Sequence, residues 1–141
     1  MFDALIGYAI SMVFFIPFIL TLRRTMLLCS TESRSLSPRL IWLLLIPFFT
    51  FVWSFVVVVK LAESLHKEFL KREIETDKAP GQTIGLAAST LSVIAIIPNH
   101  ILDLVVIVGL PAVICWIIYW IKMWRFSVQL KAALQAAQPG S

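Results

Sequence analysis

Glu63 and His66 have the spacing that is most suggestive of chemistry in this sequence, because together they form a Glu-x-x-His motif. Residues three apart on a helix project from one face, and di-iron four-helix proteins bind metal through such motifs. Those centres need two copies and further glutamates that face a core. Here the motif occurs once, in a segment rich in charged residues. We interpret it as a solvated helix face and predict no metal site and no cofactor.

Asn99, His100 and Asp103 form a second polar group, between two apolar segments. A histidine beside a carboxylate near a membrane surface can relay protons or bind a metal ion. One histidine and one aspartate do not complete a metal site, however. We therefore interpret the group as a polar turn that caps two helix ends.

The composition indicates that lipid surrounds most of the chain. Of the 141 residues, 60% are hydrophobic and 14% are charged, whereas soluble domains are about half apolar and a quarter charged. A chain this short buries only about two-thirds of its surface. The net charge is +4, but the basic residues lie between and after apolar runs, where they would meet lipid headgroups. The predicted partner is a bilayer and not a nucleic acid.

Four apolar segments set the predicted fold class, an all-α membrane protein with one integral domain over residues 1–141. The predicted transmembrane helices are residues 4–22, 40–59, 83–97 and 104–121. We expect the second helix to start at Ser37, with Pro47 as a kink, and to continue as a cytoplasmic amphipathic extension over 60–76. The tail is 126–141.

Leu61, Leu65 and Phe69 share one face of the extension. We expect this face to meet the bilayer surface or a partner helix. Glu68 and Arg72 are spaced i, i+4 on the same helix, and such a pair stabilises a helix by a few tenths of a kcal/mol.

Small residues mark the third segment as a packing helix. Side chains of this size let helix backbones approach closely in a membrane. The residues predicted to form this helix-packing face are Gly81, Gly85, Ala88, Ser89 and Ser92.

No Asp, Glu, Lys, Arg or His lies near the middle of any predicted span. Proton relays, ion-coupled transporters and intramembrane hydrolases usually place such groups there despite the cost. We therefore predict that the protein is not an enzyme and acts by association, as a homo-oligomer or an accessory subunit of a membrane complex. The alternative is a small oligomeric channel or transporter whose pore is lined by serine and threonine residues of the third span.

The distribution of basic residues predicts the orientation. Four successive spans place both termini and the middle loop on one side, and eight of the 12 lysine and arginine residues lie there. The other four are in the first loop, over residues 23–39. Because basic residues concentrate on the cytoplasmic side, both termini and the extension are predicted to be cytoplasmic.

The segment from residue 38 to 122 resembles a family of small bacterial inner-membrane proteins with four helices and no assigned activity. The residues that carry this resemblance are Pro38, Trp42, Leu45-Ile46-Pro47-Phe48, Trp53, Phe55, Lys60, Ala62, Ser64-Leu65, Glu68-Phe69, Ile84-Gly85-Leu86, Ile97-Pro98 and Cys115-Trp116-Ile117-Ile118-Tyr119-Trp120-Ile121-Lys122. The resemblance implies a location in the bacterial inner membrane. It implies no mechanism and no catalytic residue.

Overall fold

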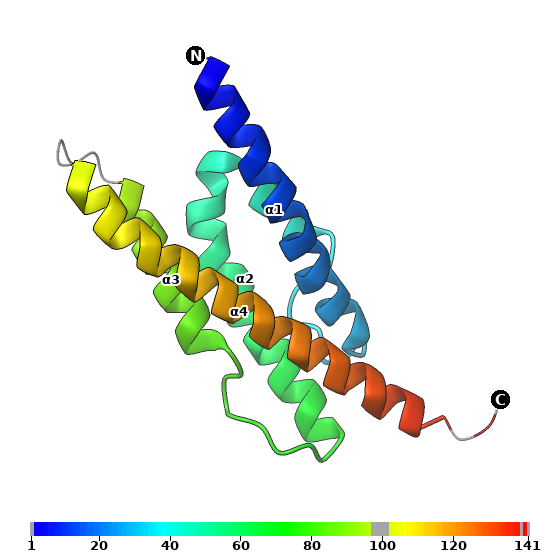
Figure 1. Cartoon of the computed structure of the whole chain (residues 1–141). Coiled ribbons are helices and arrows are strands. Elements are labelled where there is room, and N and C mark those ends of the chain that lie inside the picture. The colour runs from blue at the N-terminus through cyan, green and yellow to red at the C-terminus, as the bar shows by residue number, and fades with distance from the viewer. Residues whose placement is uncertain (1, 97–101, 139, 141) are drawn as a thin grey trace.

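The computed structural model describes residues 2–96, 102–138 and 140 (Figure 1). Throughout this part of the chain the regular structure is helical, which confirms the predicted all-α class. The elements are α1 (Phe2–Leu28), the 3₁₀ helix η1 (Leu40–Leu45), α2 (Pro47–Lys71), α3 (Gln82–Ile96) and α4 (Leu102–Ala136).

Two stretches of the described chain, Phe49–Lys71 and Ile107–Ala136, are long and apolar enough to cross a bilayer. Gln82–Ala95 is apolar but shorter. At 1.5 Å per residue, α3 is about 22 Å long, whereas the hydrocarbon core of a bilayer is about 30 Å thick. The length and composition of these two stretches therefore support a membrane protein. They account for two of the four predicted spans, and the other two are not established.

The first helix is longer than the predicted 4–22 span, because α1 continues past Arg23 and Arg24 to Leu28. Its end is stabilised by Arg34, whose guanidinium donates hydrogen bonds of 2.9–3.0 Å to the backbone carbonyls of Met26, Leu27 and Cys29. Carbonyls in the last turn of a helix have no partner within the helix, so these bonds satisfy them.

Ile46 divides the segment that was predicted to be one helix from Ser37. Its extended backbone (φ −81°, ψ 112°) separates η1 from α2, and Pro47 occupies the first turn of α2. Proline disfavours helical conformation in the preceding residue and tolerates a first-turn position because it lacks an N–H. The predicted kink at Pro47 is therefore a helix start, and α2 ends at Lys71, within the predicted 60–76 extension.

Residues 30–46 run back along α2, whereas the sequence predicted a loop followed by a second membrane-spanning helix. Glu32 forms an ion pair of 2.9 Å with Lys71, and the carbonyl of Leu40 accepts a 2.8 Å hydrogen bond from the Trp53 indole. As a result α1 and α2 point the same way, and the chain termini lie at opposite ends of the bundle (Figure 1). This arrangement departs from the alternating one expected from four successive spans, which placed the termini together.

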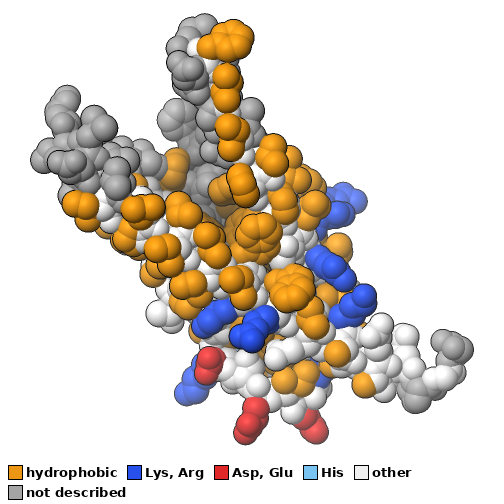
Figure 2. Space-filling view, in the orientation of Figure 1, with side chains coloured by type: hydrophobic (Ala, Val, Ile, Leu, Met, Phe, Trp, Pro, Cys, Tyr) orange, Lys and Arg blue, Asp and Glu red, His pale blue; other side chains and the backbone are white. Residues whose placement is uncertain are grey.

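The basic residues gather at one end of the bundle. All 12 lysine and arginine residues fall within 23–39, 60–78 and 122–131, the segments around the C-terminal ends of α1, α2 and α4. Figure 2 shows charged side chains over the lower part and right flank of this face and hydrophobic side chains over the upper part. We refer below to the charged end and the apolar end.

The core lies where α1, α2 and α4 meet. Its fully buried side chains include Ile19, Leu22, Met26, Leu61, Leu65, Phe69, Tyr119, Met123 and Leu130. Beside them Phe18 makes edge-to-face contacts with Trp116 and Trp120, at ring centroid distances of 5.2 and 6.2 Å. Aromatic pairs in this arrangement are favourable beyond the area they bury.

Candidate functional site

The small residues of α3 allow it to pack closely against α2 and α4. A Cβ atom added at Gly85 would lie 2.6 Å from Cγ1 of Val58 on α2 and 2.9 Å from Cε2 of Tyr119 on α4. Ala88 and Ser89 are fully buried. The predicted packing face is therefore occupied by contacts within this chain.

Gly81 and Ser92 extend the same contact. Gly81 has a φ of +75°, which favours glycine, and a Cβ there would lie 2.5 Å from Cε of Met123. Ser92 Oγ accepts a 2.9 Å hydrogen bond from the Trp116 indole and donates one of 2.7 Å to the Ala88 carbonyl. A tryptophan N–H in an apolar environment thus has its partner on the neighbouring helix.

Two further hydroxyl groups of α3, those of Ser89 and Thr90, bond within their own helix. Ser89 donates to the Gly85 carbonyl at 2.9 Å, and Thr90 donates to the Leu86 carbonyl at 2.8 Å. Hydroxyls that bond to the carbonyl four residues earlier are satisfied without a neighbour or water. Their geometry favours a packing role over the pore-lining role of the alternative hypothesis.

Leu61, Leu65 and Phe69 do not form an exposed face. All three side chains are fully buried, and the Phe69 ring contacts the Phe126 ring of α4 at a centroid distance of 5.7 Å. The expectation that they meet the bilayer or a partner is corrected, because the chain's own core covers the apolar side of α2.

Glu63 of the Glu-x-x-His motif is partly exposed and forms ion pairs of 3.1 Å with Lys60 and 2.7 Å with Lys67. His66 is only partly exposed, and its buried Nδ1 has no hydrogen-bond partner in the described part of the chain. Within the described residues, no group of three or more His, Cys, Asp and Glu side chains could hold a metal ion. Of the predicted polar turn, Asn99 and His100 lie outside the described residues. Asp103 belongs to α4, but its side chain lies outside them as well.

Glu68 is a buried carboxylate that was expected to be an ordinary surface partner of Arg72. It has no exposed surface. Its Oε2 accepts hydrogen bonds from the Ser30 backbone N–H (2.9 Å) and hydroxyl (2.8 Å), and its Oε1 is paired with Arg72 Nη2 at 2.7 Å. We call this group, with the neighbouring Ser33 hydroxyl, the Glu68 clasp. It fastens the segment after α1 to the charged end of α2.

The clasp sets the protonation state of its carboxylate. Glu68 lies outside the predicted span of 40–59, in the charged extension that follows Lys60. Burial raises its pKa, but hydrogen bonds from Ser30, Ser33 and Arg72 outweigh burial and lower the pKa to about 2. The carboxylate therefore stays ionised at neutral pH. Sequence spacing identified the Arg72 partner, but only the return of residues 30–46 along α2 brings in Ser30.

A cavity of about 540 Å³ opens at the charged end, between the α2–α3 connection and α4. Ile74 and Phe126 give it apolar surface above the fully buried Phe69, and the rest of its lining is polar, with Glu75, Thr76, Asp77 and Gln129. No periodicity in the sequence marks this cavity, because its residues come from an irregular connection and a helix some 50 positions later.

No protein-family model, curated protein or solved structure matches this chain. The resemblance to small four-helix inner-membrane proteins remains a prediction, and the function is inferred from the chain's own geometry. In the residues that the structure describes, that geometry offers packed helices, the buried carboxylate of Glu68 and the cavity at the charged end.

Proposed function

We propose that this protein is a non-enzymatic integral membrane protein of the bacterial inner membrane that acts by association, as a homo-oligomer or an accessory subunit. The observation that carries the proposal is the surface of α1. Ile6, Ile10 and Val13 are 50%, 56% and 68% exposed, and spacings of four and three place them on one helix face. In Figure 1 this half of α1 diverges from α4. We propose that a partner helix covers this face.

We also propose how the bundle is oriented in the membrane. The charged end, with all 12 lysine and arginine residues, faces the cytoplasm, because basic residues are retained on that side. The C-terminus is then cytoplasmic, and the N-terminus, at the apolar end, is directed to the opposite side. α1 enters from that side, whereas η1–α2 and α3–α4 form two hairpins that insert from the cytoplasm.

Cysteine labelling tests this orientation. In a chain with Cys29→Ser and Cys115→Ser, we expect Thr31→Cys and Lys78→Cys both to resist a membrane-impermeant maleimide in intact cells and to react in inverted vesicles. Both positions are exposed at the charged end. Four alternating spans would place them on opposite sides, so reaction of Thr31→Cys alone in intact cells would contradict the proposed hairpins.

The α1 face is tested by adding bulk to it. We expect Val13→Trp to weaken association about tenfold or more, equivalent to about 1.4 kcal/mol, as measured by native mass spectrometry and co-purification in mild detergent. Val113→Trp is the matched control, since Val113 is 55% exposed on α4. If the parent chain is monomeric and nothing co-purifies with it, association is not its function.

A further inference from the structure

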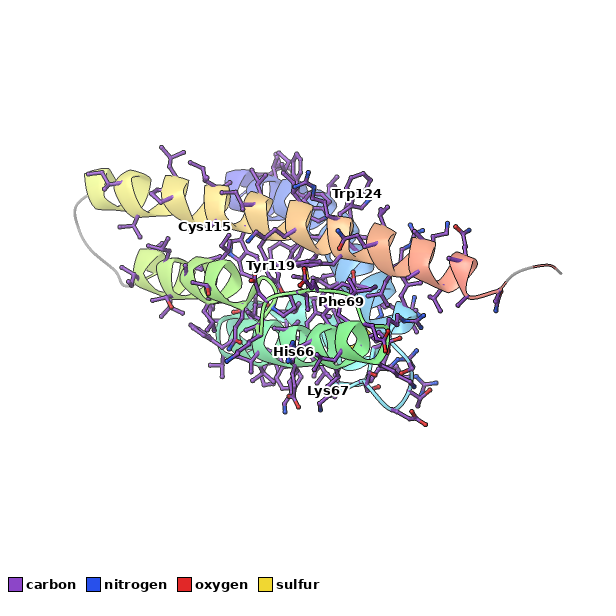
Figure 3. All side chains as sticks on the ribbon, turned by 90° about the horizontal axis from the view of Figure 1, so that it is seen from below. His66, Lys67, Phe69, Cys115, Tyr119 and Trp124 are labelled. Atoms are coloured by element: carbon purple, nitrogen blue, oxygen red, sulfur yellow. The ribbon has the colours of Figure 1, made fainter. Side chains whose placement is uncertain are left out.

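The apolar floor of the cavity at the charged end is formed by Phe126 and Ile74, which are partly exposed. Phe69 is fully buried there and contacts Phe126 at a ring centroid distance of 5.7 Å. The Ile74 backbone N–H donates a 3.0 Å hydrogen bond to the Phe69 carbonyl, which holds the connection against the end of α2. Figure 3, which shows the molecule from below, places Phe69 between α2 and α4. The floor is therefore fixed by the core rather than by the loop alone.

The rim of the cavity is acidic although the surrounding end is basic. Glu75 and Asp77 line it and are exposed. The ion pairs found in the described part of the chain use Glu32, Glu63 and Glu68 as acids, which leaves both rim carboxylates available. Lys78 follows Asp77 in sequence but does not line the cavity.

The apolar floor and the acidic rim together favour a ligand that has both an apolar part and a positive charge. The cavity is open to solvent, and its volume of about 540 Å³ is large enough to admit one small molecule. Aromatic faces attract cations, and carboxylates form charge-assisted hydrogen bonds with ammonium groups. An anion would meet two negative charges, and a neutral apolar molecule would leave the carboxylates without a counter-charge.

We propose that this cavity binds a small soluble organic cation, an ammonium group carried on an aromatic or aliphatic body. The ammonium pairs with Glu75 and Asp77, and the body contacts Phe126 and Ile74. Thr76 and Gln129, which also line the cavity, offer further hydrogen-bonding groups at its rim. This site is independent of the α1 face, so either proposal can fail without the other.

The test uses the full chain in a non-ionic detergent, labelled with ¹⁵N and titrated with benzylammonium. We expect saturable shifts of the Thr76 and Gln129 amide signals with a dissociation constant of about 1 mM, a normal affinity for so few heavy atoms. Benzyl alcohol, the neutral analogue of the same shape, should bind at least about tenfold more weakly, because it lacks the charge that pairs with the rim.

Variants assign the binding to the rim. The double variant Glu75→Gln/Asp77→Asn should raise the dissociation constant at least about tenfold, while the remaining amide signals confirm that it folds. Glu73→Gln removes a neighbouring carboxylate that does not line the cavity and should leave the constant unchanged. Non-saturable shifts, equal binding of benzyl alcohol, or unaltered binding by the double variant would each overturn the proposal.

Discussion

Gly85→Leu is expected to destabilise the bundle by at least about 3 kcal/mol, because α3 has no room for a side chain at this position. Even a single Cβ would lie 2.6 and 2.8 Å from the two methyl carbons of Val58 and 2.9 Å from the Tyr119 ring. These atoms belong to two different helices, so α3 cannot relieve one contact without tightening the other. Tyr119 is itself fully buried, so its ring has little freedom to move away.

Alanine at the same position isolates the steric effect. Replacing a mid-helix glycine with alanine normally stabilises a helix by about 0.5–1 kcal/mol, but here overpacking costs about 1–3 kcal/mol. We therefore expect Gly85→Ala to be destabilising overall. Gly109 provides the control, because it lies in α4 and a Cβ atom added there would meet nothing within 4 Å. Gly109→Ala should accordingly be neutral or stabilising.

Unfolding in mixed micelles of increasing dodecyl sulfate content, followed by tryptophan fluorescence, measures both effects. Trp116 reports directly, since its indole is bonded to Ser92 on α3. Val58→Ala should partly rescue Gly85→Ala by removing the two closest methyl carbons. Equal stability of the Gly85→Ala and Gly109→Ala variants would show that the close approach of α3 to α2 and α4 does not exist in the protein.

The packing role of Gly85 could be predicted from the sequence because it depends on the residues next to it in the chain. Small residues at helical spacing report close approach whatever the neighbouring helix is, so the pattern identified the packing face of α3. It did not identify the residues that α3 packs against, because nothing in the sequence around Val58 and Tyr119 indicates that they contact Gly85. The start of α3 was also predictable from local sequence, since α3 begins at Gln82, one residue from the predicted start.

Contacts between segments that are distant in the chain could not be predicted from the sequence. Residues 23–39 are basic and follow an apolar run, which is equally typical of a loop on either side of a membrane. Their true neighbour is fixed by pairs distant in sequence, such as Glu32 with Lys71. The face of Leu61 and Leu65 was misassigned for the same reason, since amphipathicity shows that a face is covered but not by what.

The second large effect is expected at the Glu68 clasp. Glu68→Ala should destabilise the protein by about 3–5 kcal/mol, because removing one partner of a buried ion pair leaves the other charge and its hydrogen-bond donors unsatisfied. Arg72 and the Ser30 backbone N–H would lose their 2.7 and 2.9 Å contacts. Glu63→Ala is the control, since its exposed pairs with lysine should contribute at most about 1 kcal/mol.

Limited proteolysis can show which segment becomes accessible in the Glu68→Ala variant. Opening of the clasp should free the segment after α1, so trypsin should cleave Glu68→Ala after Arg34 faster than it cleaves Glu63→Ala. Arg34 is normally engaged with the carbonyls of Met26 and Cys29. The double variant Glu68→Leu/Arg72→Leu should recover part of the stability, because it leaves no buried charge unpaired.

The pH dependence gives an independent check on the clasp. The Glu68 pKa falls from its ordinary value of 4.5 to about 2 in the folded chain, so the unfolded chain binds the proton more readily. The stabilisation is therefore complete above about pH 5 and is lost as the pH falls toward 2. We expect the parent chain to lose stability across this window relative to Glu68→Gln, which has no proton to take up. Parallel stability curves for the two chains from pH 6 to pH 2 would mean that the buried carboxylate is not held ionised by Ser30 and Arg72.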